Sequence, residues 1–175
     1  IEYVVKGERA QIVLAEISSF QLDTIEAFRP RLCVLLNITA DHLDRYPNFE
    51  AYADSKIRIF KNQRVEDVAV LNGADPLVRA KTKDIKSQRL FFSTLEANEQ
   101  GAILNGKRII LNLDKLQTIQ PKFRIPQFAF RIQEYLDISK IRLLGRHNFE
   151  NAAAASLAAL AAGASSLLTT PTYET

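Results

Sequence analysis

Residues 32–47 read LCVLLNITADHLDRYP, and this stretch decides the fold. It opens with an apolar run, Leu32–Asn37, whose continuous Leu and Val content is typical of a strand buried on both faces of a parallel sheet. A polar run follows directly. The same order occurs earlier, where the apolar run Gln11–Ile17 leads into EISSFQL at residues 16–22. Because the carboxyl ends of parallel strands meet at one edge of a sheet, we expect both polar runs to lie there.

Helices are expected to alternate with these strands. Between the second strand and a third, Asp67–Asn72, apolar residues repeat at helical spacing over 48–60, with Asn48 as the N-cap. Asp75-Pro76 provides a cap and a first turn for a helix that we expect to reach about Ile85. The alternation predicts a parallel sheet with crossover connections.

The second half of the chain predicts antiparallel strands and a final helix. Asn105-Gly106 is the strongest short hairpin signal, and it joins two strand-like runs. Asn148 is expected to cap an alanine-rich helix that ends at Gly163. The hairpin runs are Ala102–Leu104 and Lys107–Leu113; Gln127–Ile132, Tyr135–Ile138 and Ile141–Leu143 are further strand candidates, and Asp114–Ile125 is expected to be loop. The expected fold class is α/β: a mostly parallel sheet flanked by helices, with a smaller antiparallel section.

Composition indicates one globular domain. Of 175 residues, 47% are hydrophobic and 25% charged, which is enough for a core over residues 1–168, with 169–175 as a polar linker or cut end. A net charge of +3 does not favour nucleic acid as a partner, and no apolar run approaches the length that crosses a bilayer. The single cysteine, Cys33, is expected to be a buried hydrophobe in a cytoplasmic protein. The chain contains no methionine, so we expect it to be a piece of a longer protein.

Several polar residues after the first two strands could hold a metal ion. Glu16 ends the first apolar run, and Asp41 and His42 follow the second. If the strands are neighbours, these side chains can converge on a hard cation or a polarised water. The spacing leaves a second interpretation open, in which Glu16 caps the next turn and His42 makes a structural hydrogen bond.

Lys56 breaks the apolar face of its helix, because it shares that face with Phe49, Tyr52 and Phe60. It must extend its amine to solvent, pair with an anion or lose its charge. An uncharged amine would react with carbon dioxide to give a carbamate, which binds metals. Near the last helix, Asn148 and Asn151 offer amide groups of the kind that contact a purine edge.

Together these motifs resemble the central, ATP-binding domain of the Mur ligases, over roughly residues 10–165. The resemblance rests on residues 16–22, on Asn37-Ile38-Thr39 with Asp41-His42-Leu43-Asp44, and on the helix holding Lys56. It also rests on Asn72 before Asp75, and on Gly145-Arg146-His147-Asn148 with Asn151. The stretch EISSFQL is most similar to the branch of the family that adds D-glutamate to UDP-N-acetylmuramoyl-L-alanine in peptidoglycan synthesis.

The resemblance implies roles for individual residues. Glu16, His42 and Lys56, the last as a carbamate, would hold Mg2+; Asn148 and Asn151 would contact the adenine of ATP; and Ser18 and Gln21 would approach the muramoyl-peptide substrate. ATP would phosphorylate the substrate carboxylate, and the amine of D-glutamate would attack the resulting acyl phosphate. The family's phosphate loop precedes the point where this sequence begins. The isolated chain is therefore expected to be inactive, to bind ATP weakly and to self-associate through an exposed sheet edge.

Three other interpretations are weighed against this one. Another Mur-type amide ligase or a folylpolyglutamate synthase would perform the same chemistry, but the stretch Ser18–Gln21 argues against both. A non-catalytic nucleotide-binding module is disfavoured because Glu16, His42 and Lys56 occur together. A purely structural α/β domain would leave Lys56 unexplained.

Overall fold

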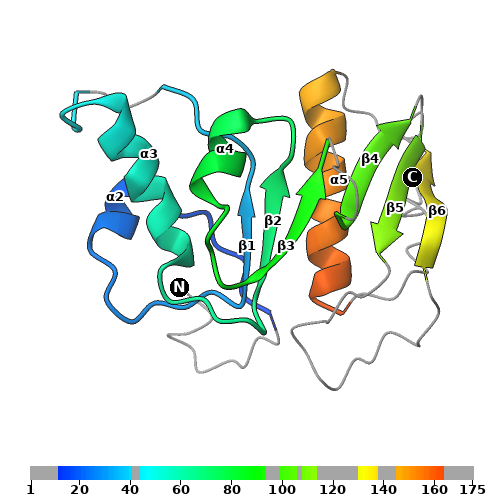
Figure 1. The fold of residues 1–175 in the computed structure, drawn as a ribbon, viewed down its shortest axis with the longest axis horizontal. Helices are drawn as coiled ribbons and strands as arrows, with labels where there is room; N and C mark the ends of the chain where they lie inside the picture. The colour runs from blue at the N-terminus through cyan, green and yellow to red at the C-terminus, as the bar shows by residue number, and fades with distance from the viewer. Residues whose placement is uncertain are drawn as a thin grey trace, which may run out of the picture.

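Within the described residues, a six-stranded sheet forms the centre of the molecule, with the strands in the order in which they follow along the chain (Figure 1). The computed structural model describes residues 12–40, 44–93, 99–105, 108–113, 130–137 and 145–163. Four strands are parallel and the last two continue antiparallel: β1 (Leu32–Leu35), β2 (Val68–Asn72), β3 (Gln88–Phe92), β4 (Gly101–Asn105), β5 (Arg108–Leu113) and β6 (Phe130–Asp137). The expected fold class is confirmed.

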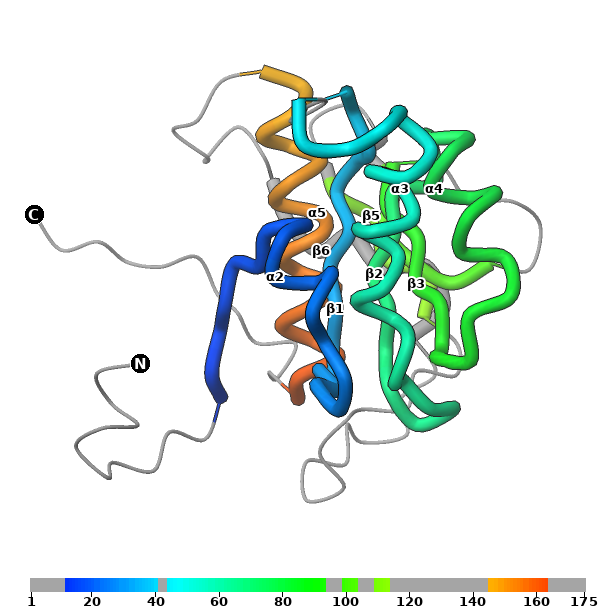
Figure 2. Tube along the Cα trace, turned by 90° about the vertical axis from the view of Figure 1, so that its left-hand side faces the viewer, coloured from blue at the N-terminus to red at the C-terminus, as the bar shows by residue number. Residues whose placement is uncertain are grey.

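Helices cover both faces of the sheet. Helices α3 (Phe49–Ile57) and α4 (Pro76–Lys81) lie on one face, with a 3-10 turn at Arg58–Phe60, and α5 (Arg146–Ala161) lies on the other (Figures 1 and 2). In β2, Val68 and Val70 belong to the hydrophobic cluster between the sheet and α5. Ala69 and Leu71 belong to the cluster between the sheet and helices α3 and α4. All four are fully buried, which explains why this strand reads as an unbroken apolar run.

Most of the expected local elements are confirmed. The second and third expected strands are β1 and β2, with β1 ending two residues before Asn37. The Asn48 side chain caps α3 by accepting from the Ala51 amide at 2.9 Å, and Asp75 caps α4. The expected hairpin is the antiparallel pair β4 and β5. None of the described helices is long and apolar enough to cross a membrane.

The strand expected at Gln11–Ile17 is wrong over its described part. Residues 12–17 lie in irregular backbone, and the side chains of Ile12, Val13 and Leu14 are 59, 71 and 96% exposed. The sheet order places β1 at an edge of the described sheet, and residues 12–17 do not pair with it. Without a neighbouring strand to satisfy its backbone, an apolar run does not form a strand.

Two helix boundaries also differ from expectation. Helix α4 ends at Lys81 rather than near Ile85, because the Thr82 hydroxyl donates to the Val78 carbonyl at 2.7 Å and the chain then turns toward β3. Helix α5 begins at Arg146 with Gly145 as its cap residue, so Asn148 lies inside the first turn and is not the cap. Gly145 has a φ of +104°, which glycine adopts without a steric penalty.

Two of the described elements were not expected from the sequence. One is β3; the other is the short helix α2 (Ser19–Asp23). Strand β6 occupies part of the region where separate strands were expected. The expected loop at 114–125, the strand residues 127–129, 138 and 141–143, and the chain end 164–175 lie outside the described residues.

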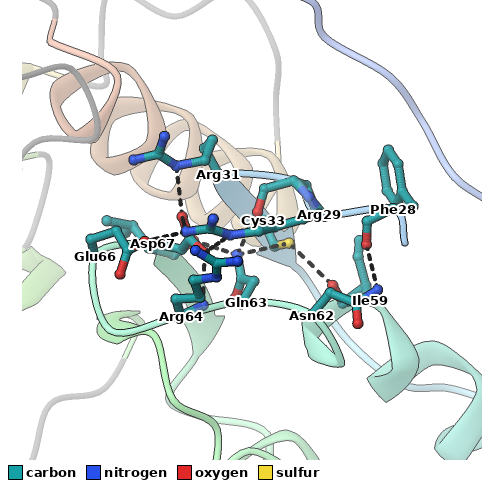
Figure 3. Close-up of polar contacts among 12 residues, drawn as sticks. Phe28, Arg29, Arg31, Cys33, Ile59, Asn62, Gln63, Arg64, Glu66 and Asp67 are labelled. Carbon is teal, nitrogen blue, oxygen red and sulfur yellow. Dashed lines mark hydrogen bonds and ion pairs between the residues drawn. The ribbon is translucent and has the colours of Figure 1, made fainter. Parts of the chain in front are cut away.

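A charged cluster fixes the amino ends of β1 and β2 (Figure 3). The fully buried carboxylate of Asp67 accepts hydrogen bonds from Arg29 Nε at 2.7 Å and Nη2 at 3.0 Å, and from Arg31 Nε at 2.7 Å. It also accepts from the Arg64 amide at 2.7 Å. Burial by itself would raise the pKa of Asp67, but these hydrogen bonds outweigh it and hold the pKa below its ordinary value. The cluster therefore anchors the amino ends of these strands. The polar runs are expected at the opposite, carboxyl ends.

Candidate functional site

The polar run after β1 is held in place by side chains that follow β2. Asn72 Nδ2 donates to the Leu36 carbonyl at 2.9 Å, and the amide of Ile38 donates to Asp75 Oδ2 at 3.2 Å. The other carboxylate oxygen of Asp75 caps α4. Asn72 and Asp75 therefore fix residues 36–38 at the carboxyl ends of β1 and β2, where parallel sheets build sites.

Helix α2 is organised by the two residues that were expected to approach the muramoyl-peptide substrate. Ser18 and Gln21 form a capping box, in which the Ser18 side chain accepts from the Gln21 amide and the Ser18 amide donates to Gln21 Oε1 at 2.9 Å. The two side chains also contact each other at 3.1 Å. Both residues are exposed, so the structure places them side by side at the surface.

Lys56 is half-buried on α3, and its amine lies over an aromatic ring. Its Nζ is 5.3 Å from the centroid of the Tyr52 ring, a distance that suits a cation–π contact. Among the described residues the amine makes no ion pair. The structure therefore gives Lys56 an attractive neighbour on the apolar face and leaves its nitrogen without an anion from the described part of the chain.

The other two expected metal ligands are Glu16 and His42. Glu16 lies in the irregular segment before α2, where its carboxylate is exposed and makes no hydrogen bond or ion pair with a described residue. His42 and the neighbouring Asp41 lie outside the described residues. Within the described ranges, no three His, Cys, Asp or Glu side chains gather closely enough to hold a metal ion. The convergence of Glu16, His42 and Lys56 therefore stays a prediction.

Asn148 and Asn151 lie near the start of α5. The helix begins beside the carboxyl ends of the parallel strands and runs back along the sheet (Figures 1 and 2). Asn151 is exposed and Asn148 half-buried, and Arg146 is tied to Glu150 by an ion pair of 3.1 Å. The two asparagines therefore lie near the carboxyl ends of the strands, as residues 36–38 do. They lie on the opposite face of the sheet from α3.

Tyr46 makes contacts between the candidate-site helices that were not expected from the sequence. Its hydroxyl donates to Asp23 Oδ2 at 2.8 Å and lies 3.1 Å from Ser55 Oγ. These partners lie in α2 and α3, so Tyr46 connects the helix of the Ser18 motif to the helix of Lys56. No local pattern marks this role, because both partners are distant in the sequence.

The family model of the Mur ligase middle domain matches residues 3–159. The chain is 42% identical over 164 residues to a UDP-N-acetylmuramoylalanine–D-glutamate ligase of Desulfosudis oleivorans, covering 94% of this chain and 32% of that protein. It is 44% identical over 157 residues to the ligase of that name from Desulfatibacillum aliphaticivorans, covering 89% and 31%. The chain thus spans about a third of the length of these relatives.

Among solved structures, the fold is similar to that of the UDP-N-acetylmuramate:L-alanyl-gamma-D-glutamyl-meso-diaminopimelate ligase from Neisseria meningitides. The superposition has a TM-score of 0.51 at 21% sequence identity, and it covers 79% of this chain and 38% of that one. At this identity the similarity concerns the fold alone.

Proposed function

This chain belongs to the Mur ligase family, and from that premise we propose that it is the middle part of an enzyme that joins D-glutamate to UDP-N-acetylmuramoyl-L-alanine. The observation that carries the proposal is the identity of 42–44%, over about nine-tenths of the chain, to relatives named for that reaction. The residues EISSFQL at 16–22, placed around the capping box of α2, are the part of the site on which the choice of branch rests.

The proposed reaction is an ATP-dependent amide synthesis. A carboxylate oxygen of the UDP-linked substrate attacks the γ-phosphorus of ATP, ADP leaves, and an acyl phosphate forms. The nitrogen of D-glutamate then attacks the acyl carbon, the bond to the phosphate oxygen breaks, and the amine releases its proton.

Two described residues fit a role in binding Mg2+. The Glu16 carboxylate is exposed and makes no ion pair with a described residue, and the Lys56 amine is likewise uncommitted to an anion there. Hard cations prefer oxygen ligands, which Glu16 supplies directly and Lys56 supplies once its neutral amine has added to carbon dioxide and released a proton. We propose that these two residues and His42 hold the ion. When bound, the ion would offset the negative charge of the phosphates.

We propose that Asn148 and Asn151 contact adenine and that Ser18 and Gln21 contact the UDP-linked substrate. The first turns of α5, which hold both asparagines, lie beside the carboxyl ends of the parallel strands, and this supports the first assignment. The exposure of Ser18 and Gln21 supports the second assignment, and their capping box holds both side chains in one turn.

The test is phosphate release from ATP by the full-length ligase that contains this chain, with UDP-N-acetylmuramoyl-L-alanine and one amino acid at a time. Release with D-glutamate, and not with L-lysine or diaminopimelate, is the expected result. Lys56→Ala and Glu16→Ala should each abolish it, whereas Ser156→Ala, on α5, should not. Release with another amino acid would move the protein to a sister enzyme, and no release would overturn the proposal.

We also propose that the protein is cytoplasmic and that the 175-residue chain alone is inactive. We further propose that this chain self-associates through β1, the strand at one edge of the described sheet. Val34 in β1 is 37% exposed and Leu36 beyond it 38%, so this edge carries apolar surface. Light scattering during size-exclusion chromatography should show a mass that rises with concentration, and Val34→Lys should reduce it. A constant monomer mass would contradict the self-association, and turnover by the chain alone would contradict its inactivity.

A further inference from the structure

Helix α2 has five residues, which is too short to be stable alone. Its stability must come from the α3 side, where the side chains of two residues donate hydrogen bonds to its backbone carbonyls. The Ser55 hydroxyl, in a residue that is 3% exposed, donates to the Ser19 carbonyl at 2.9 Å. Arg58 Nε donates to the Leu22 carbonyl at 2.9 Å. The position of α2 is therefore set by α3 and the turn that follows it.

Tyr46 completes this contact at the end of α2. Asp23 is the last residue of the helix, where the free backbone carbonyls make a carboxylate unfavourable. The Tyr46 hydroxyl donates a hydrogen bond to Oδ2 of this carboxylate at 2.8 Å, and its oxygen lies 3.1 Å from the buried Ser55 hydroxyl. One phenol group therefore connects α2, α3 and the turn at 44–48.

The Tyr46 ring continues the same connection through aromatic contacts. It stacks on Phe20 of α2, with centroids 6.0 Å apart and planes 11° apart, and it meets the Tyr52 ring of α3 edge-on at 5.5 Å. Tyr52 in turn lies under the Lys56 amine at 5.3 Å. A continuous series of rings thus leads from the Ser18–Gln21 capping box to the half-buried Lys56.

We propose that Tyr46 is a positioning residue. Its hydroxyl holds the Ser18–Gln21 turn at a fixed place relative to Lys56, so that the UDP-linked substrate can contact both. This inference rests on the proposed function. Tyr46 itself need not touch the substrate; it acts through α2. Losing this contact should therefore weaken binding of the UDP-linked substrate and leave ATP binding unchanged. The proposed adenine contacts, Asn148 and Asn151, lie on another element across the sheet.

The test is steady-state kinetics of the full-length ligase with Tyr46→Phe. This substitution keeps the ring contacts and removes the hydroxyl that donates a hydrogen bond to Asp23. The KM for UDP-N-acetylmuramoyl-L-alanine should rise about tenfold, the effect of losing one hydrogen bond to a charged group. The KM for ATP should stay within about twofold of the wild-type value. A purely structural role would instead lower kcat, through a smaller folded fraction, and leave both KM values unchanged.

Asp23→Ala is the second variant, since it removes the acceptor of the same bond from an exposed position and leaves Tyr46 intact. Both substitutions remove the same hydrogen bond. The double variant should therefore raise the KM for the UDP-linked substrate no further than either single variant does. Ser156→Ala is the matched control: its hydroxyl donates at 2.8 Å to a carbonyl of its own helix and connects no other element. It should leave both KM values unchanged.

The outcomes separate the inference from the function on which it rests. If the wild-type ligase uses D-glutamate and Tyr46→Phe keeps the wild-type KM for the UDP-linked substrate, the positioning role is wrong and the proposed function stands. An equal rise in both KM values, or additive effects in the double variant, would also overturn it. If the wild-type ligase does not use this substrate, both fail.

Discussion

Removing the carboxylate of Asp67 should destabilise the chain more than any change to a surface charge. Asp67→Asn keeps the side-chain shape, but it places an NH2 group where Oδ2 now accepts from Arg29 Nε and from the Arg64 amide, both at 2.7 Å. The guanidinium of Arg29, whose side chain is 21% exposed, then loses its buried counter-ion and keeps only the more exposed Glu66. Breaking a buried ion pair by removing one partner costs about 3–5 kcal/mol.

Urea unfolding of the 175-residue chain, followed by circular dichroism, measures this cost. With a slope of about 2 kcal/mol per molar urea, the midpoint should fall by about 2 M. Asp84→Asn is the matched control, because Asp84 is 85% exposed and contacts Lys83 at only 3.9 Å, so its midpoint should change little. Equal midpoints for the two variants would refute the structural role of the cluster.

The acid dependence gives an independent check on the same group. The hydrogen bonds lower the pKa of Asp67 from its ordinary value of 3.8, so its contribution to stability is complete above that pH. The contribution is lost as the pH falls below 3.8 toward the lower pKa of the folded state. The difference in unfolding free energy between the wild type and Asp67→Asn should therefore shrink on acidification through this window, and a difference that stays constant would contradict the argument.

Three further predictions follow from single contacts. Asn48→Ala should cost about 1 kcal/mol in urea unfolding because it removes the cap on the Ala51 amide, and Asn48→Asp should restore most of it. Gly101→Ala should prevent native folding, since the added Cβ would lie 1.7 Å from the Phe91 carbonyl oxygen; a native circular dichroism spectrum would contradict this. Burial raises the pKa of Cys33 to about 12, so iodoacetamide at pH 8 should label it only after urea is added, and labelling of the folded chain would count against its burial.

Elements whose signals are local could be predicted from the sequence. Strand β2 reads as a continuous apolar run because both of its faces are covered, and α3 begins after Asn48 because that side chain caps it within one turn. Helix α2 could have been found in the same way, since Ser18 and Gln21 have the spacing of a capping box. Its polar residues were interpreted for chemistry, and their structural role was overlooked.

The arrangement of the site depends on long-range contacts that no local pattern encodes. Residues 12–17 and β1 are both rich in apolar residues, yet only β1 is a strand, because it pairs with β2 through backbone hydrogen bonds. Composition therefore predicts that a segment tends to be buried, whereas pairing decides whether it becomes a strand. The same distinction applies to Tyr46, whose hydrogen-bond partners Asp23 and Ser55 are 23 and 9 residues away. The chemical groups of the site are proposed from the family's motifs. The contact of α2 with α3 sets the positions of Ser18 and Gln21 relative to Lys56.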